Sequence, residues 1–82
     1  MREPYSDMPC DETLDAQGLR CPMPLLKAKK ALAQLSSGQR LGVLATDPGA
    51  VNDFTRYSQL TGHTLEVVQQ QDDVFYFVMV KK

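Results

Sequence analysis

The chain has 82 residues, enough for one small domain with a thin core and too few for a deep, enclosed cofactor pocket. Its formal net charge of −1 gives no general attraction to nucleic acid or to acidic membranes. No apolar run approaches the ~20 residues that cross a bilayer, and the N-terminus lacks the pattern of a secretory signal. We therefore expect a cytoplasmic protein with no membrane contact.

The charge is divided unevenly along the chain. Residues 1–15 carry a net charge of −4, and residues 16–82 carry a net charge of +3. The first twelve residues show no hydrophobic periodicity, so we predict an acidic, flexible leader at 1–12 and a single domain at 13–82. The basic residues of that domain are few and are not interleaved with stacking aromatics, so no direct nucleic-acid binding is expected.

The first three predicted elements are a strand, a helix and a strand. A short strand is predicted at 13–16, ended by Gly18. A helix is predicted from Pro22 to about Leu35, because apolar residues recur there at helical spacing. Residues 40–46 are mostly apolar on both faces, which is typical of an interior strand. The predicted inward residues of the helix are Leu25, Ala28, Leu32 and Leu35.

A second helix is predicted after Asp47, which can serve as its N-cap, with Pro48 at the first helical position. Gly62 suits the left-handed position that follows the last turn. Two strands at about 63–70 and 74–81, joined by a short polar turn, predict an antiparallel hairpin. The predicted inward residues of this helix are Val51, Phe54, Tyr57 (or Ser58) and Leu60.

This β-α-β-α-β-β order predicts an α+β fold, a two-layer α/β sandwich in which both helices cover one face of a four-stranded mixed sheet. The last strand alternates between the two faces. If one set of its residues faces the helices, the other forms an apolar patch on the open face, either a partner surface or simply strand-forming residues. The inward set is Phe75, Phe77 and Met79, and the outward set is Tyr76, Val78 and Val80.

Cys21 lies where the first helix is predicted to begin. We place it at the N-cap, with Pro22 and Pro24 stiffening the first turn and leaving the backbone N–H groups of Cys21 and Met23 near the sulfur. The helix N-terminus and the adjacent Arg20 should lower the pKa of the thiol and favour the thiolate. The alternative is an ordinary buried cysteine at a helix start.

The other chemistry-bearing residues do not form a second site. Cys10 and Cys21 miss the CxxC spacing and the chain has one histidine, His63, so we expect no metal site and no permanent disulfide. His63, just after the second predicted helix, is expected to be a surface or strand-end residue rather than a base. A single reactive thiol without a base suits group carriage better than self-sufficient catalysis.

The segment from Leu14 to Pro24, with its Cys-Pro-Met-Pro, resembles the signature of the TusA/SirA-like family of small sulfur carriers. Residues 46–50, Asp53 and Gly62-His63 resemble the start and end of that family's second helix. The resemblance implies the same β-α-β-α-β-β fold and a persulfide on Cys21. The sulfur would come from a pyridoxal-phosphate-dependent cysteine desulfurase or a rhodanese-like donor and pass to an acceptor protein.

In the best-known branch of the family this relay ends in 2-thiouridine in tRNA, and other branches feed molybdenum cofactor synthesis or sulfur oxidation. The resemblance thus implies a monomeric sulfurtransferase component without a cofactor of its own. Lys27, Lys29 and Lys30 would make the approach to the site basic. We hypothesise that Arg20, Lys27 and Lys30 guide docking to acidic partner surfaces; the alternative for the lysines is an ordinary solvated helix face.

Two other functions remain open from the sequence. The protein could be a non-catalytic thiol-redox or regulatory interaction domain that uses its open sheet face. The leader could instead fold over the site, so that Cys10 resolves the persulfide or forms a redox switch with Cys21.

Overall fold

The sheet combines one parallel pair of strands with an antiparallel hairpin. The computed structural model describes residues 10–82, and its strands are β1 (Glu12–Ala16), β2 (Arg40–Ala45), β3 (Thr64–Gln71) and β4 (Val74–Val80). Their order is β1-β2-β4-β3. β1 pairs in parallel with β2, and β4 pairs antiparallel with both β2 and β3. The predicted four-stranded mixed sheet is confirmed.

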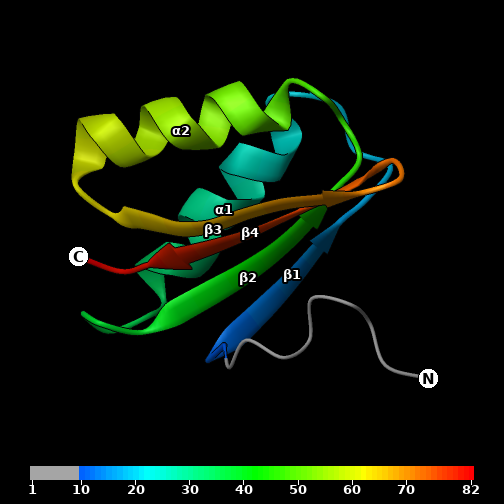
Figure 1. Cartoon of the computed structure of the whole chain (residues 1–82). Helices are drawn as coiled ribbons and strands as arrows, with labels where there is room; N and C mark the ends of the chain where they lie inside the picture. Colours follow the sequence, from blue (N-terminus) through cyan, green and yellow to red (C-terminus); the bar gives the residue numbers. More distant parts are fainter. Residues whose placement is uncertain (1–9) are drawn as a thin grey trace.

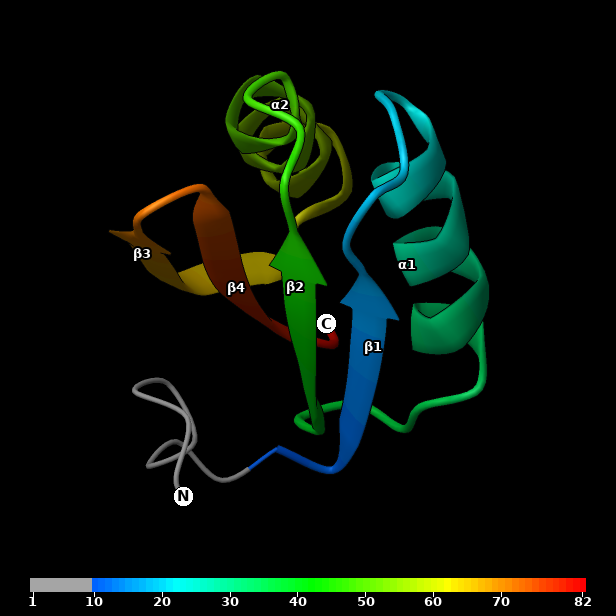
Figure 2. The same ribbon diagram turned by 90° about the vertical axis from the view of Figure 1, so that its right-hand side faces the viewer.

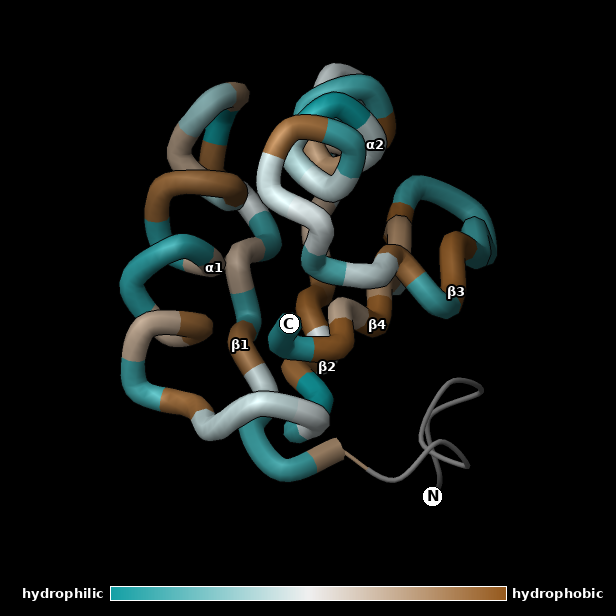
Figure 3. The backbone as a smooth tube through the Cα atoms, turned by 90° about the vertical axis from the view of Figure 1, so that its left-hand side faces the viewer, coloured by the Kyte–Doolittle hydropathy of each residue, from teal (hydrophilic) through white to brown (hydrophobic). Residues whose placement is uncertain are grey.

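Both helices cover the same face of this sheet, as Figures 1 and 2 show. They are α1 (Met23–Ala33) and α2 (Ala50–Thr61), which begin at the same edge of the sheet. Figure 3 shows hydrophobic positions concentrated in the strands, whereas both helices alternate between hydrophobic and hydrophilic positions. The predicted α+β sandwich is therefore confirmed, and within the described residues no helix is long and apolar enough to span a membrane.

The core between the two layers centres on Phe54 of α2 and Phe77 of β4. Their rings stack with centroids 4.5 Å apart, and neither side chain is exposed. Ala28 and Leu32 of α1 are buried in the same cluster, and Leu25 packs against it, as predicted. No polar or charged side chain is buried among residues 10–82, so apolar contact holds the layers together.

One inward residue of α2 was predicted wrongly. Leu60 is 78% exposed, whereas Phe54 is buried and Val51 and Tyr57 are partly buried against the core. The reason is the helical repeat: six residues beyond Phe54, a side chain is rotated by about 120° from the buried direction. The C-terminus of α2 is as expected, because Gly62 follows it in the left-handed conformation, with φ 85°.

The open face of the sheet is not the exposed apolar patch that the alternation predicted. Tyr76 and Val78 are buried, with exposed fractions of 6% and 0%. They form a second small cluster against which Leu44 of β2, Val67 of β3 and Cys10 pack. Side chains from the neighbouring strands and from the segment before β1 therefore cover the predicted outward positions, and a docking surface centred on Tyr76 and Val78 is wrong.

The end of the predicted leader is part of the described structure. β1 begins at Glu12, one residue earlier than predicted. Asp11 makes two hydrogen bonds with the backbone of Arg40: its N–H donates to the Arg40 carbonyl, and its side-chain carboxylate accepts from the Arg40 N–H at 2.8 Å. Cys10 Sγ lies 3.4 Å from the Tyr76 hydroxyl, in the second cluster rather than in the core beneath the helices. Residues 1–9 of the predicted leader lie outside the described residues.

Replacing Phe54 by alanine should remove the main contact between the layers. The expected loss is about 3–5 kcal/mol of unfolding free energy, because a fully buried aromatic ring is deleted. Leu60→Ala is the matched control on the same helix and should change stability by less than about 0.5 kcal/mol. Urea unfolding followed by circular dichroism measures both, and equal losses would contradict this account of the core.

Candidate functional site

The site lies at the edge of the sheet where β1 and β2 both end. Because these strands are parallel and end in register, with Ala16 opposite Ala45, the two loops that lead into α1 and α2 leave from the same edge. Two hydrogen bonds join the loops. The Gly18 N–H donates to Thr46 Oγ1 at 2.9 Å, and the Cys21 N–H donates to Asp47 Oδ2 at 2.8 Å.

Asp47 fixes both loops through one carboxylate. Its Oδ2 accepts the Cys21 N–H, while its Oδ1 accepts the N–H of Gly49, two residues further along its own loop, at 2.8 Å. These two bonds lower the pKa of Asp47, as does the charge of Arg20. Asp47 was predicted to cap α2. Instead the helix begins at Ala50 with Gly49 at the N-cap, and the Asp47 side chain binds the opposite loop.

The Cys21 side chain points toward the first turn of α2. Its Sγ donates a hydrogen bond of 2.5 Å to Oδ2 of Asp53. Gly49 lies directly beside it: a Cβ at position 49 would stand 3.3 Å from Cys21 Cβ and 3.4 Å from Sγ. The thiol is exposed to solvent, so the alternative of a buried cysteine is wrong.

The electrostatic prediction for this thiol is also wrong. The pKa of Cys21 is raised from 9.0 to about 11, chiefly by the hydrogen bond to Asp53, then by desolvation and by the negative charges of Asp53 and Asp47. The two backbone N–H groups that were expected to stabilise a thiolate donate hydrogen bonds to other acceptors. The Cys21 N–H binds Asp47, and the Met23 N–H binds the Arg20 carbonyl at 2.7 Å. The unloaded site therefore favours the neutral thiol.

The two prolines lie one position away from their predicted places. α1 begins at Met23, so Pro22 rather than Cys21 is the N-cap, and Pro24 occupies the second helical position. The Pro22 carbonyl accepts the first helical hydrogen bond, from Leu26 at 3.0 Å. Pro24 is fully buried against the core, and the Cys21–Pro22 peptide bond is cis. Arg20 is exposed in the loop before them.

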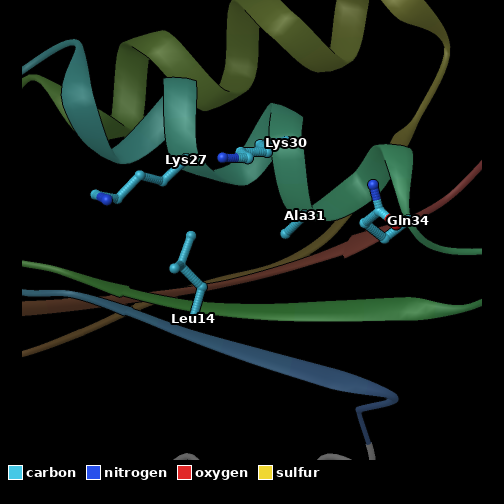
Figure 4. A pocket seen from close by; sticks show the side chains of 5 residues that line it. All are labelled: Leu14, Lys27, Lys30, Ala31 and Gln34. Atoms are coloured by element: carbon cyan, nitrogen blue, oxygen red, sulfur yellow. The ribbon is translucent and has the colours of Figure 1, made fainter.

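Lys27 and Lys30 do not surround the thiol. They line an open hollow of about 350 Å³ between α1 and β1, and Cys21 is not among its lining residues. Figure 4 shows Leu14 rising from β1 toward Ala31 of α1, with the two lysines and Gln34 along the helix. The Lys29 ammonium group instead lies 5.4 Å from the centre of the Tyr57 ring.

The edge that presents Cys21 is acidic rather than basic. Besides the two carboxylates described above, Asp15 lies near the end of β1, and the turn between β3 and β4 carries Asp72 and Asp73 at the same edge. The expected basic approach is therefore corrected: the lysines lie along α1, and Arg20 is the cation of the Cys21 loop.

The two cysteines are free and lie on different parts of the molecule. Cys10 packs in the cluster around Tyr76 and Val78, whereas Cys21 lies at the helix starts, beside Asp47 and Asp53. His63 follows the far end of α2, where its Nδ1 accepts the Lys82 N–H at 3.0 Å. Among residues 10–82, no group of three or more acidic, cysteine or histidine side chains is placed to hold a metal ion.

From the sequence, Asp53 and Gly49 were noted only as part of the resemblance at the second helix start, and they were given no role beside the thiol. An aspartate in the first turn of a helix is commonly explained by the helix dipole, and a glycine before a helix by its cap. The signal that could have found them is the parallel pairing of β1 and β2, which brings the start of the second helix beside the first.

Fold and site together define a class of protein: a small two-layer α+β domain that presents one exposed thiol at the starts of both its helices. Comparisons with known proteins agree with this class. The model of the sulfurtransferase TusA family matches residues 12–82. The sulfur carrier protein TusA of Allochromatium vinosum is 48% identical over 71 residues, which cover 87% of this chain and 93% of that protein.

A candidate sulfur carrier of Neisseria meningitidis is 54% identical over 71 residues, covering 87% of this chain and 96% of its own. The crystal structure of a SirA-like protein from Desulfitobacterium hafniense superposes with a TM-score of 0.74 at 30% identity, covering 84% of this chain and 95% of that one. The chain belongs to the sulfurtransferase TusA family, which confirms the family that its sequence resembles.

Asp47→Asn should make the protein less sensitive to acid. The folded-state pKa of Asp47 is lowered, so its stabilising contribution is present above about pH 4 and is lost as the pH falls through the lowered value. The difference in unfolding free energy between wild type and Asp47→Asn should shrink between about pH 5 and pH 2. Urea titrations across this range measure it. A difference that stays constant would contradict the role of the two hydrogen bonds.

Proposed function

We propose that this protein is a sulfur carrier in which Cys21 accepts one sulfur atom as a persulfide and delivers it to an acceptor protein. The observation that carries the proposal is the exposed Cys21 thiol at the sheet edge where both helices start. The names of the relatives as sulfur carriers support it. An exposed thiol on a small domain is reachable by the cysteines of two different partners in turn.

The proposed transfer consists of two displacements at sulfur. In the first, the Cys21 thiolate attacks the terminal sulfur of a donor persulfide, R–S–SH. A new S–S bond forms as the donor's S–S bond breaks, and the donor leaves as R–S⁻. In the second, an acceptor thiolate attacks the terminal sulfur of Cys21–S–SH and releases the Cys21 thiolate. Each step moves one sulfur atom without net oxidation.

The geometry favours partners that supply the remaining chemistry. α2 spans twelve residues, roughly 18 Å, between the Cys21 edge and His63, so this histidine cannot serve Cys21 as a base. We propose a pyridoxal-phosphate-dependent cysteine desulfurase or a rhodanese-like protein as donor, because both classes present a persulfide on a cysteine. The carrier is then a component of a sulfurtransferase system rather than a self-sufficient enzyme.

For the destination of the sulfur, the family resemblance favours 2-thiouridine in tRNA over other sulfur-transfer pathways. Nucleoside analysis of tRNA from cells that carry Cys21→Ser in place of the wild-type chain addresses this directly. Loss of 2-thiouridine supports the tRNA route, and an unchanged content assigns the carrier to another pathway.

Sulfur loading should depend on Cys21 and not on Cys10. Incubation with a cysteine desulfurase and cysteine should add about 32 Da to the intact protein, and reductant should remove it. Cys10→Ser is the matched control and should load like wild type, because Cys10 packs on the other face of the sheet. A Cys21→Ser variant that still gained this mass would exclude Cys21 as the carrier.

We further propose that Lys27 and Lys30 guide a protein donor. Both are exposed beside a hollow with an apolar floor formed by Leu14 and Ala31, which suits an acidic partner surface with an apolar side chain. Reversing both charges, in Lys27→Glu with Lys30→Glu, should slow loading by a desulfurase about tenfold at low salt. Loading by a small-molecule persulfide should not change.

The exposed Arg56 of α2 provides the control for this charge reversal. Arg56→Glu should load from the desulfurase at the wild-type rate. If the double lysine variant also loads at the wild-type rate, or if Arg56→Glu is slowed equally, the hollow has no role in docking the donor.

A further inference from the structure

The unloaded thiol faces a carboxylate, which is unexpected in a residue that must act as a nucleophile. Cys21 Sγ donates to Asp53 Oδ2 at 2.5 Å, and Gly49 leaves no side chain between the thiol and α2. Asp47 holds the Cys21 backbone in place, so the approach of the thiol to Asp53 is fixed by the loop. A neutral thiol can donate this bond, whereas a thiolate beside a carboxylate would be repelled.

We propose that Asp53 is a positioning residue that holds the unloaded Cys21 as a neutral thiol, and that a cationic group of the sulfur donor releases it by pairing with Asp53. This inference rests on the proposed sulfur-carrier function. It adds that the donor carries a positive charge where it contacts Asp53. The raised pKa of Cys21 agrees with the geometry, since the hydrogen bond to Asp53 is its largest cause.

The charged groups around the thiol favour this assignment. Asp53 of α2 and Asp47 of the loop before it both oppose ionisation of Cys21. The N-terminal end of α1 and Arg20 carry positive charge in the same loop. The causes that shift the pKa of Cys21 nevertheless all raise it. The turn at Asp72 and Asp73 adds further negative charge at this edge. A cation is therefore the group that the edge attracts and the group that would stabilise the thiolate.

The release step is a proton transfer followed by the displacement already described. When the donor's cation pairs with the Asp53 carboxylate, the thiol hydrogen bond is lost and the Cys21 proton passes to water. The resulting thiolate attacks the donor's terminal sulfur, the donor's S–S bond breaks, and the departing R–S⁻ takes a proton from water. Overall, Cys21–SH and R–S–SH become Cys21–S–SH and R–SH.

The first test measures the rate of Cys21 alkylation by iodoacetamide against pH, in a Cys10→Ser background. With Asp53 in place the reactive thiolate should form around pH 11. Asp53→Asn should lower this midpoint by about one unit or more, which raises the alkylation rate at pH 7 about tenfold or more. Glu12→Gln, at the exposed start of β1 and the opposite end of the sheet, should leave the midpoint unchanged, and Asp53→Glu should restore part of the shift.

The second test compares two small donors of matched length and opposite charge, the persulfides of cysteamine and of 3-mercaptopropionate. Loading of Cys21 is followed by intact mass. The wild-type protein should load severalfold faster from the cationic donor, and Asp53→Asn should largely abolish this preference. An equal preference in Asp53→Asn, or an unchanged alkylation midpoint, would overturn the inference.

Failure of the inference and failure of the proposed function give different results. If Cys21 takes up no sulfur from any donor, the sulfur-carrier proposal falls. The alkylation profile would still report whether Asp53 holds the thiol proton. If Cys21 loads normally but the midpoint does not respond to Asp53→Asn, the carrier function stands and the role of Asp53 falls.

Discussion

The site depends on one carboxylate, that of Asp47, which binds the backbone of both loops at the edge of the sheet. One oxygen holds the N–H of Cys21 and the other holds the N–H of Gly49. A single side chain thus sets the position of the thiol relative to the first turn of α2, where Asp53 lies. The parallel pairing of β1 and β2 makes this possible, because it brings the two loops to the same edge. The rest of the domain serves mainly to keep that edge in place.

Much of the fold could be predicted from the sequence because its determinants are local. Apolar spacing gave the helices within two residues of their observed ends, and Gly62 marked the end of α2. His63 was correctly expected beside the start of a strand, since β3 begins at Thr64. Leu60 was wrongly predicted to face the core: it lies six residues after Phe54, a spacing that does not return a helical side chain to the same face. Tyr76 and Val78 do lie on the other side of β4 from Phe77 and Met79, as predicted. They are buried rather than exposed, because side chains from other strands and Cys10 cover them.

The electrostatics of the site could not be predicted in the same way. Sequence neighbours of Cys21, namely Arg20 and the start of a helix, indicated a stabilised thiolate. The groups that decide its protonation are 26 and 32 positions away, at Asp47 and Asp53. Their influence arises only from the meeting of the two loops, since short-range hydrogen bonds outweigh a helix dipole and an exposed arginine. Lys27 and Lys30 were likewise expected near the site because they follow Cys21 closely in the sequence. They lie instead along a hollow beside β1.

The exposed position of Cys21 at a sheet edge determines which shapes of partner protein can reach the thiol. A thiol at the bottom of a cleft can be reached only by a thin, projecting partner, and two partners with deep active sites could never exchange sulfur through it. Here the cysteine is exposed on a loop whose backbone is held by a hydrogen bond to Asp47 in the neighbouring loop. A projecting thiol of this kind is open to partner proteins whose own reactive groups lie in recessed sites.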